Sequence, residues 1–223
     1  MTAQAIPEDP TLDEIRAGLI GDIAANAAFD GWTDKAVEAA AEGRGIDADL
    51  ARLAFADGPV DMIDQWFQSV DAEMAERLPP ATLATMKIRE RITALIETRI
   101  AIVAPNREAL RRAANLLAMP QNAPRALRFG WRTADRMWRL AGDTATDYNH
   151  YTKRLTLSMV YASTMAVFLD DESDDHADTR AFLSRRIDGV MRFEKWKAGW
   201  SRNADYRPSL SRFVGRLRYP SGR

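Results

Sequence analysis

Residues 142–191 decide the fold, and they read GDTATDYNHYTKRLTLSMVYASTMAVFLDDESDDHADTRAFLSRRIDGVM. The segment 155–169 contains no charged residue, and the acidic loop DDESDD follows it. Apolar residues then recur at helical spacing, at Phe182, Leu183, Ile187, Val190 and Met191. We expect two packed helices, the first apolar on nearly all sides and central to a helical protein. Its 15 uncharged residues are fewer than the roughly 20 that a membrane span needs.

The motif GD-x-x-x-D-x-N-x-Y-T-x-R opens this stretch, and the apolar run with Tyr161 follows it. The elements D-x-S and D-T-x-x-F-L-x-x-R-I come next. In this order and spacing, they resemble the coenzyme Q biosynthesis accessory protein nine family, most clearly from about Ile88 to Met191. The resemblance implies an all-α, TetR-like homodimer that binds isoprenoid lipid, catalyses no reaction and assists the demethoxyubiquinone hydroxylase.

The resemblance also implies a partner-binding surface close to the start of the apolar helix. Its predicted members are Asp143, Asp147, Asn149, His150, Tyr151 and Arg154. Aromatic and Arg side chains are frequent anchors of protein interfaces. His150 stands where the family more often has Trp, which reduces the apolar contact area. The residues alone also fit a helix start capped by Asp147 or Thr146, with Arg154 in a salt bridge.

Composition independently favours a helical protein. Of the 223 residues, 46 % are hydrophobic, and Ala, Leu, Arg and Glu, which favour helices, are plentiful. Cysteine is absent, which excludes disulfides and thiolate metal sites. The first residues lack the pattern of a secretory signal, so we expect a cytoplasmic protein. The resemblance, together with the tail described below, adds the expectation that it is peripheral on the inner membrane.

Residues 1–56 are predicted to form a helix-turn-helix-like head. Helices are expected at 11–29, with Thr11 and Glu14 in a capping box, at 33–42, and from Asp47 onward. This is the outline of a TetR-type DNA-binding head. However, residues 1–60 contain 12 acidic and 4 basic residues, whereas DNA affinity depends on basic residues that neutralise phosphates. We expect the shape without the activity; a TetR-type ligand-sensing transcriptional repressor is the alternative function.

Residues 57–200 are predicted to form a lipid-binding-type bundle. Helices are expected at 58–77, 82–103, 107–118 and 125–140, ahead of the two helices described above. Large, adaptable side chains are expected on inward faces. They are Trp66, Phe67, Met86, Met137, Trp138, Met159, Tyr161 and Met165. From the residues alone, an ordinary core is the favoured interpretation. The resemblance shifts it toward a pocket for an isoprenoid or phospholipid ligand.

Residues 201–223 are predicted to form a basic amphipathic tail helix. In the chain from residue 185 on, 11 basic residues face 3 acidic ones. The residues expected to contact a membrane are Leu210, Arg212, Phe213, Val214, Arg216 and Leu217. The apolar members share one stripe, and Arg212 and Arg216 lie on the far side, which suits an anionic membrane surface. The alternative is docking on its own bundle or on a dimer partner.

The sequence offers no convincing catalytic or metal site. Asp147, His150 and Ser158 lack a nucleophile elbow, and the acidic loop with His176 lacks the spacing of a calcium loop. Solvated acids at the start of the next helix, favoured by its dipole, explain that loop better. We therefore expect no cofactor, no metal and no nucleic-acid partner. Together with the resemblance, this predicts a non-enzymatic accessory protein of ubiquinone biosynthesis, which presents a polyprenylated quinone intermediate to a membrane-associated hydroxylase.

Overall fold

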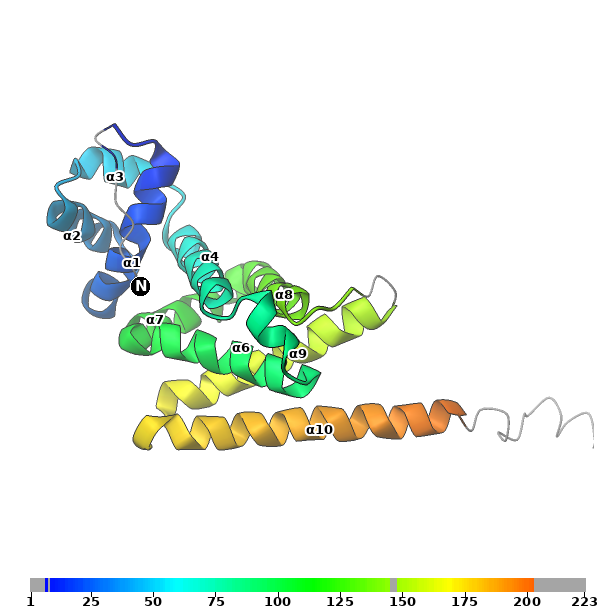
Figure 1. Ribbon diagram of the computed structural model, residues 1–223. Coiled ribbons are helices and arrows are strands. Elements are labelled where there is room, and N and C mark those ends of the chain that lie inside the picture. The colour runs from blue at the N-terminus through cyan, green and yellow to red at the C-terminus, as the bar shows by residue number, and fades with distance from the viewer. Residues whose placement is uncertain (1–6, 8, 145–147, 203–223) are drawn as a thin grey trace, which may run out of the picture. The chain divides into compact units, whose positions relative to one another are not determined.

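The computed structural model describes residue 7 and residues 9–144 and 148–202, with the helical backbone alone for residues 148, 149 and 193–202. All regular structure in these residues is helical (Figure 1), so the predicted all-α class is confirmed. Residues 1–184 form one compact unit and residues 185–223 a second. The predicted boundary after residue 56 lies inside the first unit, and the boundary after residue 200 lies inside the second; both stay predictions.

The first three helices pack together and carry the predicted caps. They are α1 (Leu12–Asp30), α2 (Asp34–Arg44) and α3 (Ala48–Ala54). Thr11 and Glu14 form the capping box of α1, and the Asp47 side chain accepts from the backbone N–H groups of Asp49 and Leu50. Gly45 ends α2 with φ 66°, a left-handed conformation that glycine adopts without a steric penalty. The predicted helix-turn-helix order is confirmed.

The remaining helices of the chain follow with short connections. They are α4 (Pro59–Arg77), α5 (Pro80–Ala84), α6 (Ile88–Val103), α7 (Arg107–Leu117), α8 (Ala123–Leu140), α9 (Tyr148–Asp170) and α10 (Ala177–Arg202). Short 3₁₀ turns occupy residues 104–106, 120–122 and 174–176. Helix α4 packs against α1, α6 and α8, and α9 packs mainly on α8. In the part of the chain that is described, no helix is long and apolar enough to span a membrane.

The predicted single helix over residues 82–103 is wrong, because two helices occupy this segment. Lys87 has an extended backbone with φ −70° and ψ 155°, and its N–H donates to the Glu90 carboxylate at 2.8 Å. This local capping bond begins a new helix at Ile88. The Arg91 guanidinium stabilises the break by donating to the carbonyls of Met86 (2.9 Å) and Ala141 (2.7 Å).

Trp32 joins the head to the helices that follow. It lies between α1 and α2, and it is almost fully buried. Its Nε1–H donates to the carbonyl of Ala109 in α7 at 3.0 Å, and its ring centroid lies 5.3 Å from that of Trp66 in α4. The head is therefore attached through a buried aromatic contact and a buried hydrogen bond.

The prediction that the apolar run is buried on nearly all sides is wrong for one face of α9. Leu157, Val160 and Phe168 are buried. Leu155 and Met159, however, are 52 % and 54 % exposed, in line with Tyr151, which is 61 % exposed. These three side chains follow one another at intervals of four residues, so they share one face. An absence of charge did not distinguish this open face from the face that packs on α8.

Candidate functional site

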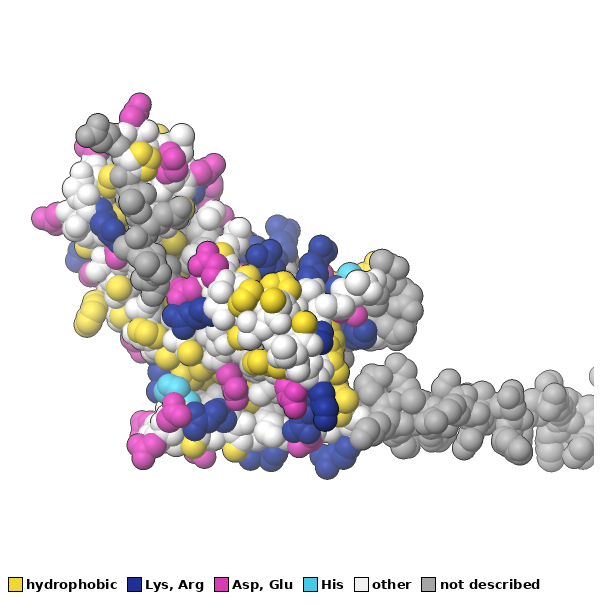
Figure 2. Space-filling view, viewed as in Figure 1, with side chains coloured by type: hydrophobic (Ala, Val, Ile, Leu, Met, Phe, Trp, Pro, Cys, Tyr) yellow, Lys and Arg dark blue, Asp and Glu magenta, His cyan; other side chains and the backbone are white. Residues whose placement is uncertain are grey.

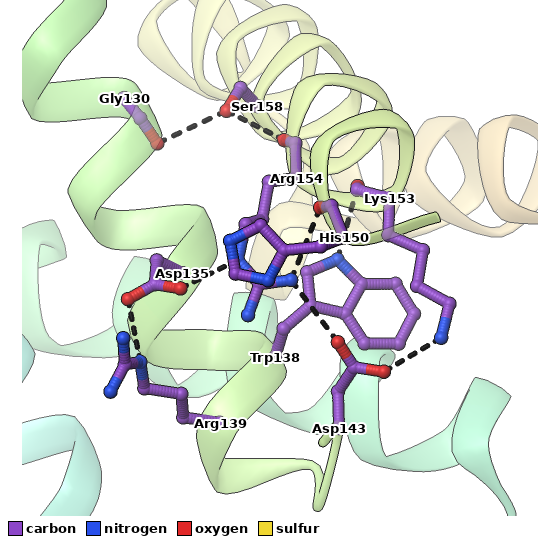
Figure 3. A network of polar contacts seen from close by, with 9 residues as sticks. All are labelled: Gly130, Asp135, Trp138, Arg139, Asp143, His150, Lys153, Arg154 and Ser158. Atoms are coloured by element: carbon purple, nitrogen blue, oxygen red, sulfur yellow. Dashed lines mark hydrogen bonds and ion pairs between the residues drawn. The ribbon is translucent and has the colours of Figure 1, made fainter. Parts of the chain in front are cut away.

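The junction of α8 and α9 is organised around Arg154. This side chain is only 2 % exposed. Its Nε donates to Asp135 Oδ1 at 2.6 Å, and its Nη1 donates to Asp143 Oδ2 at 3.1 Å. Figure 3 shows the guanidinium of α9 reaching both acids of the α8 side. Arg154 is thus an internal link between two helices, as the salt-bridge interpretation anticipated, and its head is not displayed for a partner.

Local sequence brings the two acids to this position. Asp135 lies in the last turns of α8, and Asp143 follows the turn after Leu140. Gly142 has φ 88°, and a Cβ there would lie 3.3 Å from Arg91 Nη1. The Asp143 N–H then donates to the Trp138 carbonyl at 2.9 Å. Gly142 therefore permits the tight, positive-φ turn that directs Asp143 back toward α9.

Each acid at the junction is shared by two cations. Lys153 Nζ donates to Asp143 at 2.7 Å and lies over the Trp138 ring, whose Nε1–H donates to the Lys153 carbonyl. Arg139 donates to Asp135 at 2.7 Å from the surface. Burial by itself raises the pKa of both carboxyls, but the hydrogen bonds from these cations and Arg154 outweigh it and lower the pKa of each.

The predicted partner surface is thus divided by the structure. Arg154 and Asp143 are engaged with each other, and the Asp143 side chain is only 6 % exposed. His150 is half-buried, and Tyr151 is exposed with its ring 6.0 Å from that of Trp131. Asp147 and the Asn149 side chain lie outside the described residues. Their role in binding a partner, and that of the other members, stays a prediction.

Tyr151 belongs to an exposed apolar surface that the sequence analysis did not predict. It consists of Tyr151, Leu155 and Met159 on one face of α9, all more than half exposed; Leu127 of α8, the helix on which α9 packs, is exposed as well. Contiguous exposed apolar side chains often mark interaction sites. We call this the α8–α9 apolar surface. The periodicity of apolar residues could not predict this surface, because an apolar stripe has the same sequence pattern whether it faces the core or a partner.

The predicted lipid-contacting side chains are not equivalent. Trp66, Met137 and Met165 are buried, and Phe67, Met86, Trp138 and Tyr161 are half-buried. The prediction for Met159 was wrong: this side chain was expected to face inward, but it is exposed in the α8–α9 apolar surface. Lipid contact by the other members stays a prediction.

A second polar network lies between α4, α6, α8 and α9. The Arg99 guanidinium, 1 % exposed, donates from Nη1 to Asp71 and from Nε to the Tyr161 hydroxyl at 2.6 Å. Thr133 donates to the other Asp71 oxygen at 3.3 Å. The Arg99 guanidinium also lies 5.6 Å from the Phe67 ring centroid and 5.4 Å from that of Tyr161, within the range of cation–π attraction.

The sequence analysis missed this network, although a signal was present. Asp71 and Arg99 each stand at helical spacing among apolar residues, Asp71 beside Val70 and Met74, Arg99 beside Leu95 and Ile96. A charged residue within a buried stripe needs a partner, and two such residues of opposite sign on neighbouring helices are candidates for pairing. Burial and the nearby Asp71 carboxylate raise the pKa of Tyr161, and they outweigh the Arg99 guanidinium, which lowers it. The Tyr161 hydroxyl therefore keeps its proton at neutral pH.

One acid of the acidic loop, Asp171, is buried and caps a backbone N–H group at the start of α10. Asp171 was expected among solvated acids, but it is nearly inaccessible. It accepts from the backbone N–H groups of Ser173 (2.9 Å) and Thr179 (2.8 Å) and from both hydroxyls. Burial opposes ionisation, but these bonds prevail and lower the pKa of Asp171. Across the described ranges, no group of three or more His, Asp or Glu side chains is arranged to hold a metal ion.

We predict that Arg154→Met destabilises the chain strongly. The change leaves two acids, one of them nearly inaccessible, without their shared cation, which costs about 3 kcal/mol when a buried pair is broken. Arg139→Met is the matched control, since Arg139 pairs with the same Asp135 but is 69 % exposed, and surface pairs contribute less than about 1 kcal/mol. Urea denaturation measures both. Equal losses of unfolding free energy would contradict a special role for Arg154.

We also predict that the contribution of Asp143 depends on pH. A carboxyl whose pKa is lowered by folding stabilises the folded state above its unfolded pKa, near 3.8, and this is lost as pH falls through the folded pKa. The difference in unfolding free energy between the wild type and Asp143→Asn should therefore be full at neutral pH and shrink in acid. The exposed Asp57→Asn serves as control. A difference that is constant with pH would refute the assignment.

The region that contains the α8–α9 junction is similar to known proteins. Residues 123–194, which include α8 and α9, match the COQ9 protein family. Among curated relatives, "Ubiquinone biosynthesis protein COQ9, mitochondrial" of Rattus norvegicus is 32 % identical over 72 % of this chain and 54 % of its own length. The Homo sapiens protein of that name is 30 % identical over 72 % and 52 %, and the Drosophila melanogaster protein 28 % over 84 % and 60 %. The chain thus spans little more than half of these relatives.

A solved structure supports the fold. The TetR transcriptional regulator from Nitrosomonas europaea ATCC 19718 superposes with a TM-score of 0.63, over 78 % of this chain and 95 % of that chain. Its sequence identity is 23 %, so the likeness concerns fold alone. The chain is therefore similar to the COQ9 family over residues 123–194 and has a TetR-like, all-α fold, which confirms the predicted resemblance to the coenzyme Q biosynthesis accessory protein nine family.

Proposed function

We propose that this chain acts in ubiquinone biosynthesis as a non-enzymatic, lipid-binding accessory protein that presents a polyprenylated quinone intermediate to a hydroxylase. The observation that carries the proposal is the match of residues 123–194 to the COQ9 family, whose relatives are named ubiquinone biosynthesis proteins. These residues include the α8–α9 apolar surface. A scaffold that fixes such a surface and performs no chemistry suits a partner-binding role.

In this proposal, the two polar networks support different binding functions, one for the hydroxylase and one for the lipid. The Arg154 network holds α8 against α9, so the α8–α9 apolar surface, with Tyr151, has a defined shape for the hydroxylase to contact. Trp66, Phe67 and Tyr161 would contact the lipid inside the helical unit. A polyprenyl tail is strongly apolar, and its removal from water is the driving force for binding.

Membrane association completes the proposal. The tail residues Leu210, Arg212, Phe213, Val214, Arg216 and Leu217 would rest on an anionic membrane, from which the lipid enters. They lie outside the described residues, so their pattern in the sequence alone supports this role. The chain would then be peripheral on the membrane that holds the quinone and the hydroxylase.

The head does not favour the repressor alternative. Asp47 caps α3, Asp49 lies in its first turn, and Arg52 of this helix is paired with Glu38 at 2.9 Å and with Asp49 at 2.5 Å. Figure 2 shows acidic side chains predominating on the face of α1–α3 that it presents. A surface of this charge repels phosphates, which are the main source of affinity for DNA.

We expect the purified full chain to contain a co-purified isoprenoid or phospholipid. Mass spectrometry of organic extracts measures this, and the reference is a helical protein of similar size from the same cells. Phe67→Ala should reduce the lipid per protein because it removes an interior aromatic contact. The exposed Phe29→Ala, in the head, should leave it unchanged. Extracts that repeatedly match the reference would refute the lipid-binding proposal.

A further inference from the structure

The hydroxyl of Tyr161 can donate a hydrogen bond as well as accept one, and among the described residues it only accepts. Its oxygen accepts from Arg99 Nε at 2.6 Å. A tyrosine hydroxyl can also donate, and no acceptor for its proton occurs within the described residues. Because Tyr161 keeps its proton at neutral pH, it is a neutral donor. Because the Tyr161 side chain is half-buried, this donor is available to an acceptor on a ligand that covers it.

The donor is held in a defined orientation. Arg99 is fixed between Asp71 and Tyr161, and Asp71 accepts from Thr133. The four side chains come from α6, α4, α9 and α8, so each helix restrains the hydroxyl. Arg99 is also flanked by the Phe67 and Tyr161 rings. A donor restrained in this way binds an acceptor with little loss of conformational freedom.

Accessible surface reaches the edge of this network but not its centre. Arg99 and Asp71 are buried, whereas Tyr161 and Phe67 are half-buried. A ligand atom can therefore approach the two rings without separating the ion pair. Trp66 lies against Phe67, with ring centroids 5.5 Å apart, and supplies further apolar surface beside the hydroxyl.

The charge of the network restricts the chemistry of the ligand. The positive charge of Arg99 is already compensated by Asp71. The other guanidiniums that act on Asp71 are those of Arg132, which is paired with Asp64, and of Arg136, which is exposed. A phosphate would therefore add a second negative charge beside Asp71 in a poorly solvated environment, which is unfavourable. A neutral oxygen acceptor, such as a ring carbonyl or phenolic oxygen, needs only a neutral donor. The aromatic rings of Phe67 and Tyr161 also suit a flat, apolar ring.

We infer that Tyr161 donates a hydrogen bond to a neutral oxygen on the ring of a lipid bound within the first unit, with Arg99 and Asp71 as positioning residues. The inference rests on the proposed lipid binding and deepens it. It makes the ligand an oxygenated aromatic or quinone ring with an apolar tail, and it disfavours a phospholipid at this position. The tail contributes affinity, and the Tyr161 hydroxyl contributes selection for the ring.

Two probes with one tail test this inference on the full chain. They are a decyl-substituted ubiquinone and decylbenzene, which lacks ring oxygens. Each is partitioned between detergent micelles and immobilised protein and quantified by mass spectrometry. Tyr161→Phe removes only the hydroxyl and should weaken quinone binding roughly fivefold, the size of one neutral hydrogen bond. Decylbenzene binding should not change. Ser163→Ala is the matched control, because it removes a hydroxyl of the same helix that donates to the Val160 carbonyl.

The outcomes separate this inference from the proposed function. If both probes bind the wild type and Tyr161→Phe keeps the same preference for the quinone, the inference is wrong and lipid binding stands. If neither probe binds the wild type, both fail. A loss confined to dodecylphosphocholine, used as a third probe, would assign the site to a phosphate and overturn the inference. Should Tyr161→Phe unfold, as judged by circular dichroism, Thr133→Val loosens Asp71 instead and should lower the preference for the quinone by a smaller factor.

Discussion

The ion pair between Asp71 and Arg99 is the interaction on which the arrangement of the bundle depends. A buried charge is tolerated only when a partner and further hydrogen bonds compensate its lost hydration. Here Thr133 and Tyr161 complete that compensation, so α4, α6, α8 and α9 must meet in one register. Apolar packing among these helices would permit several registers, whereas the pair permits few. The same requirement leaves a tyrosine hydroxyl oriented in the interior.

A second arginine plays a comparable part at the end of the bundle. Arg154 connects α9 to acids of the α8 side, and Gly142 makes the turn that places one of them. The motif shared with the COQ9 family is therefore divided in role. Gly142, Asp143 and Arg154 build the junction, whereas Tyr151 is displayed beside it. Within the described part of the motif, the charged groups of Asp143 and Arg154 face inward and hold the junction, while the Tyr151 side chain is exposed.

Local signals made much of the fold predictable. The caps at Thr11 and Asp47 and the Pro/Gly turns act within a few residues, so the sequence reveals them directly. The start of α6 at Ile88 was missed because the Lys87–Glu90 cap lies within a continuous apolar pattern. The remaining errors concern distant contacts. Met159 was placed in the interior, because periodicity defines a face without identifying what covers it, and for the same reason the sequence left the partner-binding and salt-bridge interpretations of Arg154 open. The pairing of Asp71 with Arg99 joins residues far apart in the chain, so a charge within each apolar stripe signalled the need for a partner without identifying it.

The central claim is that this chain supports ubiquinone synthesis without catalysing it. The most direct measurement is the quinone content of cells that lack the chain, with the hydroxylase gene intact, quantified by liquid chromatography and mass spectrometry. The account predicts a fall in ubiquinone and accumulation of the precursor that the hydroxylase consumes, both reversed by the wild-type chain. Normal ubiquinone content, accompanied by derepression of an operon, would contradict it.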